Sequence, residues 1–168
     1  MSDPVCLTQG WRPGLLGDAI ALQSRTYAQL AGFGLAFEAV LARGLGEFAT
    51  RLDRPGNAIW SAHQGEVTLG TIAIDGEDMG PGVAHLRWFV VAPGLRGGGI
   101  GRRLLAAALD FADAAGFAET QLWTFRGLDA ARRLYEAAGF ALTEERPGAQ
   151  WGSTVQEQRF TRYRSSPR

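Results

Sequence analysis

The sequence has little of three things that would point to particular classes of protein: cysteine, charge of one sign, and long apolar runs. Cys6 is the single cysteine, so no disulfide can form within the chain. The 17 basic and 17 acidic residues cancel, which leaves no electrostatic footprint for nucleic acid or an anionic membrane. No window approaches the roughly 18 apolar residues of a membrane span, and the N-terminal residues lack the charged and apolar regions of a signal peptide. We therefore expect a cytoplasmic protein that binds neither nucleic acid nor membrane.

What the chain does have is enough apolar residues for one compact domain. Its 168 residues lie in the usual single-domain range, and its 46% hydrophobic content can fill a core. We expect one domain over residues 1–163. The last residues, 164–168, carry no packing signal, so we expect a disordered tail there.

Helix and strand signals alternate along the chain. Apolar residues at three- and four-residue spacing predict helices over residues 15–32, 37–48, 102–115 and 128–138. Shorter apolar or alternating runs predict strands over residues 5–11, 58–63, 67–75, 86–93, 121–125, 140–143 and 153–163. The sequence Ala-Ala-Gly-Phe occurs at 114–117 and at 137–140, and we interpret it as two helix ends, since Gly suits the left-handed position after a helix.

A glycine-rich turn joins a strand to a helix in the middle of the chain. Its sequence is Pro93-Gly94-Leu95-Arg96-Gly97-Gly98-Gly99-Ile100-Gly101. Such a turn directs several backbone N–H groups and the positive end of a helix dipole at one point, which favours phosphate. A dinucleotide fingerprint needs a third Gly where Arg102 or Leu104 stands, and a P-loop needs a lysine that this region lacks. The remaining alternative is a tight turn that uses glycine only for its positive φ.

Two motifs in order resemble the GNAT N-acetyltransferase superfamily. The spacing Arg96-x-x-Gly99-x-Gly101 resembles its acyl-coenzyme A signature, and Ala131-Arg132-Arg133-Leu134-Tyr135-Glu136 followed by Gly139-Phe140 resembles its second hallmark. The resemblance implies an α/β GNAT fold, with a mixed, mostly antiparallel twisted sheet flanked by about four helices. Segments 122–132 and 143–152 are also similar to the acetyltransferase half of proteins that fuse a MarR-type DNA-binding domain to a GNAT domain.

The resemblance implies acetyl-coenzyme A as co-substrate and no metal. Backbone groups of the strand before the turn would pair with the pantetheine arm and polarise the thioester carbonyl, and N–H groups of the turn would hold the pyrophosphate. The implied coenzyme residues are Phe89, Val90, Val91, Arg96, Gly97, Gly98, Gly99, Ile100, Gly101, Arg102, Leu128 and Ala131. Leu128 departs from the family pattern, because many relatives carry an Asn there that contacts the pantetheine. Arg103 could also neutralise the charge of the pyrophosphate. For Arg102 and Arg103 the alternative is that they lie on a solvent-exposed helix face without a binding role.

Acetyl transfer to an amine sets its own chemical requirements. An amine with a pKa near ~10 must lose a proton before it attacks, the intermediate carries an oxyanion, and a thiolate leaves. By resemblance, Tyr135 faces the sulfur and is the general acid; a core tyrosine is the alternative. Some members of the family place a Glu on the strand before the turn, and His85 stands eleven residues before Arg96 on that strand, so the resemblance makes it the candidate base; a histidine can accept a proton near neutral pH. A structural or surface histidine is the alternative there.

The acceptor site has weaker signals. Glu38, Asp75 and Glu145 are the carboxylates that could attract an amine, and Trp88 and Trp151 could line its pocket or belong to the core. We therefore expect an acetyl-coenzyme A-dependent N-acetyltransferase that acts by direct transfer on a primary amine of a small molecule or an amino-acid-like acceptor. A protein-tail or ribosomal acceptor is an alternative within this class. A non-catalytic acyl-coenzyme A sensor or interaction module is the alternative outside it. Family members often pair through the final strands, which implies a homodimer.

Overall fold

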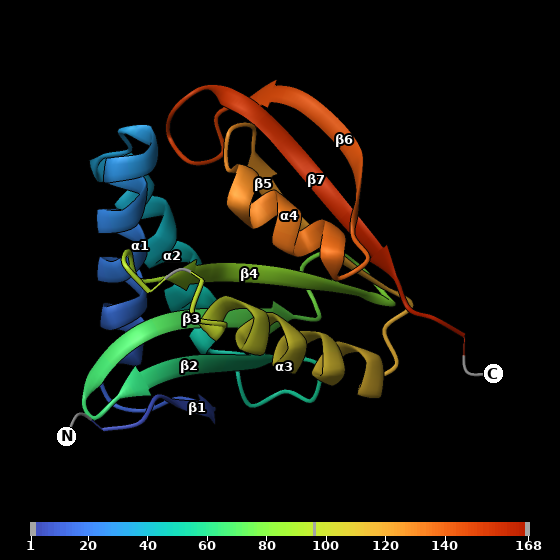
Figure 1. The fold of residues 1–168 in the computed structure, drawn as a ribbon. Coiled ribbons are helices and arrows are strands. Elements are labelled where there is room, and N and C mark those ends of the chain that lie inside the picture. Colours follow the sequence, from blue (N-terminus) through green and yellow to red (C-terminus); the bar gives the residue numbers. More distant parts are fainter. Residues whose placement is uncertain (1–2, 96, 167–168) are drawn as a thin grey trace.

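One mixed sheet organises the chain, and it takes strands from both ends of the sequence (Figure 1). The computed structural model describes residues 3–95 and 97–166. The strands, in chain order, are β1 (Cys6–Gln9), β2 (Ala58–Gln64), β3 (Val67–Asp75), β4 (Val83–Val91), β5 (Glu119–Phe125), β6 (Ala141–Gly148) and β7 (Val155–Tyr163). They lie side by side in the order β1-β2-β3-β4-β5-β7-β6, and every neighbouring pair is antiparallel except β4 and β5. The expected mostly antiparallel sheet is thus confirmed.

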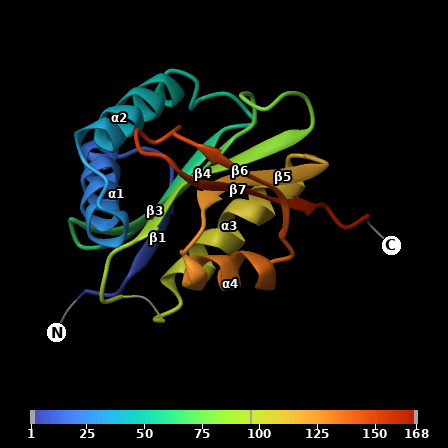
Figure 2. The same ribbon diagram turned by 90° about the horizontal axis from the view of Figure 1, so that it is seen from above.

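The helices of the described residues divide between the two faces of this sheet. They are α1 (Leu15–Ala31), α2 (Leu35–Ala49), α3 (Ile100–Ala114) and α4 (Asp129–Ala137). Seen from above, α1 and α2 lie on one side of the sheet and α3 and α4 on the other (Figure 2). The two predicted helix ends are confirmed, because Gly116 and Gly139 follow α3 and α4 with φ of 89° and 98°. Among the described helices, none has the length and apolar content needed to cross a membrane.

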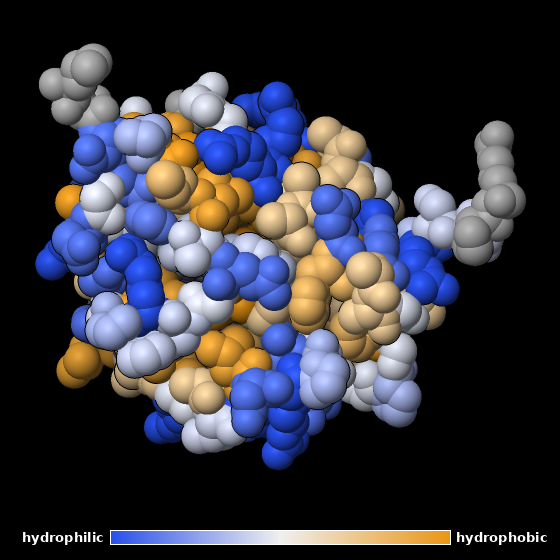
Figure 3. Space-filling model, turned by 90° about the horizontal axis from the view of Figure 1, so that it is seen from below, coloured by the Kyte–Doolittle hydropathy of each residue, from blue (hydrophilic) through white to orange (hydrophobic). Residues whose placement is uncertain are grey.

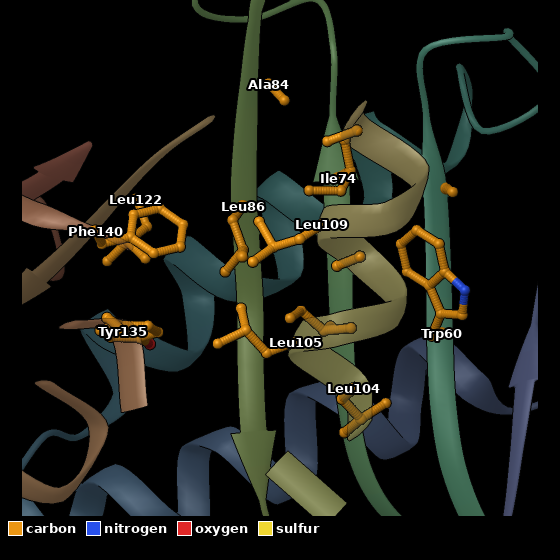
Figure 4. Packing of buried hydrophobic residues seen from close by; sticks show 14 of the residues in the cluster. Trp60, Ile74, Ala84, Leu86, Leu104, Leu105, Leu109, Leu122, Tyr135 and Phe140 are labelled. Atoms are coloured by element: carbon orange, nitrogen blue, oxygen red, sulfur yellow. The ribbon is translucent and has the colours of Figure 1, made fainter. Parts of the chain in front are cut away.

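Each face of the sheet has its own hydrophobic core. Leu104, Leu105 and Leu109 of α3 pack on the side that also holds Leu86 of β4 and Trp60 of β2 (Figure 4). The other core takes residues from α1, α2 and the sheet: Leu15, Phe37, Leu41, Leu45, Phe48, Ile59, Ala73, Trp88 and Phe125. Because both faces are covered, the middle of β3 is buried without interruption, as a sandwiched strand requires. On the face shown in Figure 3, hydrophilic and hydrophobic residues interleave.

The parallel pair β4 and β5 separates soon after it begins. Pairing covers only Val83 to His85 on β4, whereas β5 continues along β7 as far as Phe125. Beyond His85 the register between β3 and β4 shifts, and Trp88 takes a φ of 50° while its carbonyl accepts a hydrogen bond from Thr71 Oγ1 at 2.8 Å. A bulge of this kind bends a strand away from its neighbour. The sheet is therefore split between the ends of β4 and β5 (Figure 1).

The sequence placed most element boundaries to within a few residues, with some differences at the ends. The first strand is shorter than expected, and α3 begins at Ile100 rather than Arg102. β6 extends to Gly148, because its backbone stays paired with β7 through Pro147 opposite Gln156. In the expected tail, Arg164 donates its backbone N–H to the Ala118 carbonyl at 2.9 Å, and residues 167–168 lie outside the described residues.

Candidate functional site

Two cavities meet at the split in the sheet. The larger, about 480 Å³, lies between the ends of α1, β4, α3 and α4. The smaller, about 150 Å³, lies between α1, α2, the separated strands and the β6–β7 turn. Three described residues, Tyr27, Phe89 and Tyr135, line both cavities. The two cavities are therefore adjacent, with these three side chains at their common boundary.

The glycine-rich turn forms one end of the larger cavity. Gly97 and Gly99 have φ of 90° and 83°, a left-handed conformation that only glycine adopts at low energy. Gly99 is also the N-cap of α3, which has no side-chain cap and no acidic residue in its first turn. The first N–H groups of a helix have no partner within it, and here they lie beside the cavity wall formed by Gly101 and Arg102. This arrangement can bind an anion such as a phosphate group.

The residues proposed for the coenzyme mostly lie together at this cavity. Those that line it are Phe89, Val90, Val91, Gly97, Gly99, Gly101, Arg102, Leu128 and Ala131. Two others do not: the Gly98 N–H is used within the turn, 3.3 Å from the Leu95 carbonyl, and the Ile100 side chain is buried in the core. Arg96 lies outside the described residues.

The free edge of β4 continues the larger cavity toward the split. Val90 and Val91 pair with Thr71 and Gly70 of β3 on one side, while β5 pairs with β4 only up to His85 on the other. The edge of Phe89 to Val91 that faces the split is thus not covered by β5. An extended chain with amide groups can pair along such an edge as an added strand does. The pantetheine arm of coenzyme A is such a chain.

Sequence reasoning missed the contribution of α1 to this cavity. Thr26, Tyr27 and Leu30 line it from the side opposite α4. Their spacing is that of any helix face directed at a core, so no pattern in the sequence separates them from ordinary packing residues. Only the position of α1 beside the split brings them to the site.

Tyr135 stands where the two cavities meet. It is only 7% exposed and comes from α4, with its ring 6.1 Å from Phe89, 5.9 Å from Phe140 and 6.1 Å from Phe160, centre to centre. Figure 4 shows it beside Phe140 and Leu122 on one side of β4. Burial, with a further contribution from Tyr27, raises the pKa of Tyr135 well above its usual value. Its hydroxyl therefore stays protonated and can donate a hydrogen bond.

His85 lies in the wall of the smaller cavity, where β4 begins to leave β5. Its Nδ1 is 2.7 Å from Oδ2 of Asp78, in the loop between β3 and β4. When Nδ1 carries the proton and donates it to this carboxylate, the lone pair of Nε2 is free to accept another. Asp78 thus fixes the orientation of the histidine ring. Sequence reasoning did not single out Asp78, which no motif marks.

The three carboxylates suggested for attracting an amine are not brought to the cavity. Asp75 is fully buried and accepts hydrogen bonds of 2.8 and 2.7 Å from Arg51, with Arg87 at 3.2 Å. Burial would raise its pKa, but the hydrogen bonds from Arg51 and from a backbone N–H, with the charges of Arg51 and Arg87, lower the pKa to about 2. Asp75 therefore belongs to an internal ion-pair network.

Glu38 and Glu145 also lie elsewhere. Glu38 is exposed on α2, and Glu145 accepts hydrogen bonds from Gln158 and Arg126, which lower its pKa. Among the described residues that line the smaller cavity there is no Asp or Glu. Over residues 3–95 and 97–166, no group of three or more His, Cys, Asp or Glu side chains is arranged to hold a metal ion.

Both tryptophans proposed for the acceptor pocket do line the smaller cavity. Trp88 sits at the bulge of β4, and Trp151 sits on the β6–β7 turn with its ring 5.7 Å from that of Phe125. The buried carboxylate of Glu157 holds this turn by accepting two hydrogen bonds of 2.9 Å from the backbone and side chain of Gln150. Gly152 lets the turn approach α2, since a Cβ there would lie 2.5 Å from that of Ala36.

The chain resembles known proteins in sequence and in fold. Residues 28–140 match the model of the acetyltransferase (GNAT) family. Similar solved structures include an acetyltransferase of the GNAT family from Streptococcus pneumoniae, with a TM-score of 0.71, 18% identity and coverage of 95% of this chain and 99% of that one. A ribosomal-protein-alanine N-acetyltransferase from Brucella melitensis has a TM-score of 0.74 and 18% identity, with coverage of 94% of this chain and 99% of that one.

The yncA protein from Salmonella typhimurium, solved with its cofactor acetyl-CoA, gives a TM-score of 0.66, 19% identity, and coverage of 94% of this chain and 93% of that one. At these identities the likeness is one of fold. A comparison with curated proteins finds no significant match.

Proposed function

The chain belongs to the acetyltransferase (GNAT) family, and from that premise we propose that it transfers the acetyl group of acetyl-coenzyme A to a primary amine of a small molecule. One observation carries the proposal: two cavities of different character meet at Tyr135 through a split in the sheet. One has an anion-binding turn and a free strand edge, and the other is smaller, with aromatic and aliphatic side chains beside the polar groups of Gln23, His85 and Arg87. A reaction between two bound molecules without a covalent enzyme intermediate needs this arrangement.

Acetyl-coenzyme A supplies the activated acetyl group as a thioester when bound. In the larger cavity, N–H groups at the start of α3 would hold its pyrophosphate, with Arg102 adjacent. The edge of Phe89 to Val91 would hold the pantetheine arm. Leu128 contributes an apolar contact where many relatives have an Asn. The residues present therefore fit the coenzyme, with less polar contact at that one point.

The residues at the junction then have distinct roles in the proposed reaction. His85 accepts at Nε2, directly or through water, the proton that the amine loses as its nitrogen bonds to the thioester carbon. A backbone N–H at the bulge of β4 donates to the carbonyl oxygen as negative charge develops. Tyr135 donates its hydroxyl proton to the sulfur as the carbon–sulfur bond breaks, so that a thiol leaves. Exchange with water returns a proton to Tyr135 and removes one from His85.

The test is thiol release from acetyl-coenzyme A across a panel of primary amines, with mass spectrometry to identify the N-acetylated product. Turnover that depends on an amine supports the proposal, and a reaction without amine measures background hydrolysis. Peptides with free N-termini form a separate arm, since a protein tail is the alternative acceptor. Tight coenzyme binding in calorimetry with no turnover for any amine would instead support a non-catalytic acyl-coenzyme A sensor.

A homodimer is part of the same proposal. β6 is an outermost strand of the sheet and pairs only with β7 among the described strands, so its other edge is open to a second copy. Light scattering on the purified protein measures the mass in solution. A monomer at high concentration would remove this element and leave the proposed reaction unaffected.

A further inference from the structure

Gln23 of α1 is a buried polar side chain with an unused donor at the smaller cavity. It is 4% exposed and lines that cavity, and its Nε2 has no hydrogen-bond partner within the described residues. Buried amide groups are nearly always paired, because an unpaired donor loses its hydrogen bonds to water without replacement. Nε2 itself is covered by protein atoms, so a rotation of the amide group must turn it into the cavity before a bound molecule that presents an oxygen can satisfy this donor.

The charge of the cavity wall limits what that molecule can be. The two ionisable basic side chains in the wall are His85 and Arg87, and no acidic side chain of the described residues lines it. Arg87 is held by Asp75 and Asp78 at 3.2 and 3.4 Å and stacks over the ring of Trp88, 4.0 Å from its centre. A polyamine or another polycation would find no carboxylate in this wall. A molecule with one carboxylate would not be repelled by it.

The other lining residues and the cavity volume indicate the chemistry and size of the rest of the bound molecule. Most of the other lining side chains are aromatic or aliphatic, including Phe37, Val40, Leu41, Phe125 and Trp151. The cavity volume is about 150 Å³, and an apolar protein cavity of about that size holds one benzene molecule. The body is therefore apolar and no larger than a branched aliphatic or phenyl group.

The position of Gln23 on its helix places it near the boundary between the two cavities. Gln23 lines only the smaller cavity, whereas Tyr27, four residues later, lines both. Four residues advance about 6 Å along a helix, so Gln23 and Tyr27 are neighbours on one helix face. One small molecule can therefore contact Gln23 and reach the junction, as an amine and a carboxylate on adjacent carbon atoms would.

We propose that the acceptor is an apolar α-amino acid, whose carboxylate is bound by the Gln23 amide while its side chain fills the aromatic cavity and its amine points to the junction at Tyr135. This inference rests on the proposed acetyltransferase function and names the substrate class of the same site. Gln23 is then the residue that separates amino acids from simple amines.

A matched pair of acceptors isolates the oxygen that Gln23 would bind. Leucine and isopentylamine have the same branched body and the same amine, but only leucine carries a carboxylate. We expect the wild-type protein to use leucine with a KM at least tenfold lower. Equal KM values for the two acceptors, or preference for isopentylamine, would overturn the inference. An N-terminal leucine in a peptide that is used better than free leucine would also overturn it.

Variants of Gln23 connect this preference to the side chain. In Gln23→Leu we expect the KM for leucine to rise about tenfold or more, the range of a hydrogen bond to a charged group, with the KM for isopentylamine changed less than threefold. In Gln23→Glu, of the same shape, leucine should be lost while isopentylamine is retained or improved. Gln29→Leu, at an exposed position of the same helix, is the control and should change neither. Equal effects of Gln23→Leu on both amines contradict the inference.

Calorimetry separates this inference from the proposed function. If coenzyme A binds and simple amines are acetylated but leucine gains nothing from Gln23, only the inference about the acceptor fails. If no amine is turned over, leucine binding to the coenzyme A complex is still measurable. Binding that Gln23→Leu weakens tenfold supports a leucine site, and no binding overturns it. If coenzyme A itself does not bind, the proposed function fails. Calorimetric titration of the protein alone with leucine then tests the leucine site: binding that Gln23→Leu weakens supports it, and no binding overturns it.

Discussion

Replacing Tyr135 with phenylalanine removes one hydroxyl group and leaves the rest of the side chain in place. The ring packs against Phe89, Phe140 and Phe160, and a phenylalanine makes the same contacts. We therefore expect the free energy of unfolding to change by about 1 kcal/mol or less, the net contribution of one hydrogen bond. The fold and the coenzyme cavity should survive, so any kinetic effect reports on the hydroxyl itself.

The expected kinetic effect follows from the environment of that hydroxyl. General acid catalysis contributes roughly 10²- to 10⁴-fold to a rate. Burial raises the pKa of Tyr135 above its ordinary value, which makes it a weaker acid and places the effect at the lower end of that range. We expect kcat to fall about 100-fold, or ~2.7 kcal/mol of transition-state stabilisation. The raised pKa also predicts no alkaline loss of kcat from Tyr135 ionisation up to a pH of about 10.

Thiol release measured under saturating acetyl-coenzyme A and amine gives kcat, and calorimetry gives the coenzyme Kd, which should change little. Tyr163→Phe is the matched control, because Tyr163 is 69% exposed on β7 and lines neither cavity. If kcat of Tyr135→Phe falls less than about threefold while its Tm is preserved, the reasoning is refuted. Proton delivery to the sulfur would then come from water.

Three further substitutions test other parts of the site and the fold. Gly99→Val should raise the coenzyme A Kd at least tenfold, because a side chain there strains a backbone at φ 83° and projects into the open cavity. Gly80→Val is the control, because Gly80 has a φ of 94° and lies away from both cavities. An unchanged Kd in folded Gly99→Val would contradict the assignment of this turn to phosphate binding. His85→Ala should lower kcat about 100-fold and Asp78→Asn should lower it less, with the coenzyme A Kd unchanged in both, whereas a His85→Ala kcat within threefold of the wild type excludes the histidine as base. The pKa of Asp75 in the folded protein is lowered to about 2, so this carboxylate contributes roughly 2 kcal/mol to the free energy of unfolding above pH ~4, and the contribution is lost as the pH falls toward ~2. Urea unfolding at several pH values should show this loss in the wild type and not in Asp75→Asn. Equal pH dependence of the two proteins would argue against the ion pair with Arg51.

The sequence itself determined the features that depend on neighbours along the chain. Left-handed glycines after α3 and α4, the helix start at the glycine-rich turn, and the β2–β3 hairpin all follow from local backbone preferences. The same local character brings most of the residues proposed for the coenzyme to one cavity, because a strand, a turn and a helix N-terminus that are contiguous in sequence form one surface. The position of Tyr135 followed from its motif.

Only the tertiary structure decided where the smaller cavity lies and which residues other than Trp88 and Trp151 line it. Its wall is assembled from α1, α2, β4, β5 and the β6–β7 turn, and no local pattern records how elements so distant in sequence approach one another. Asp75 and Asp78 illustrate this: they are three residues apart, yet one is locked to Arg51 and the other orients His85. Gln23 has the spacing of an ordinary core-facing residue, and its unpaired amide becomes visible only once packing has buried it beside a cavity. Burial and long-range contact give these side chains their proposed roles, and both are properties of the folded chain.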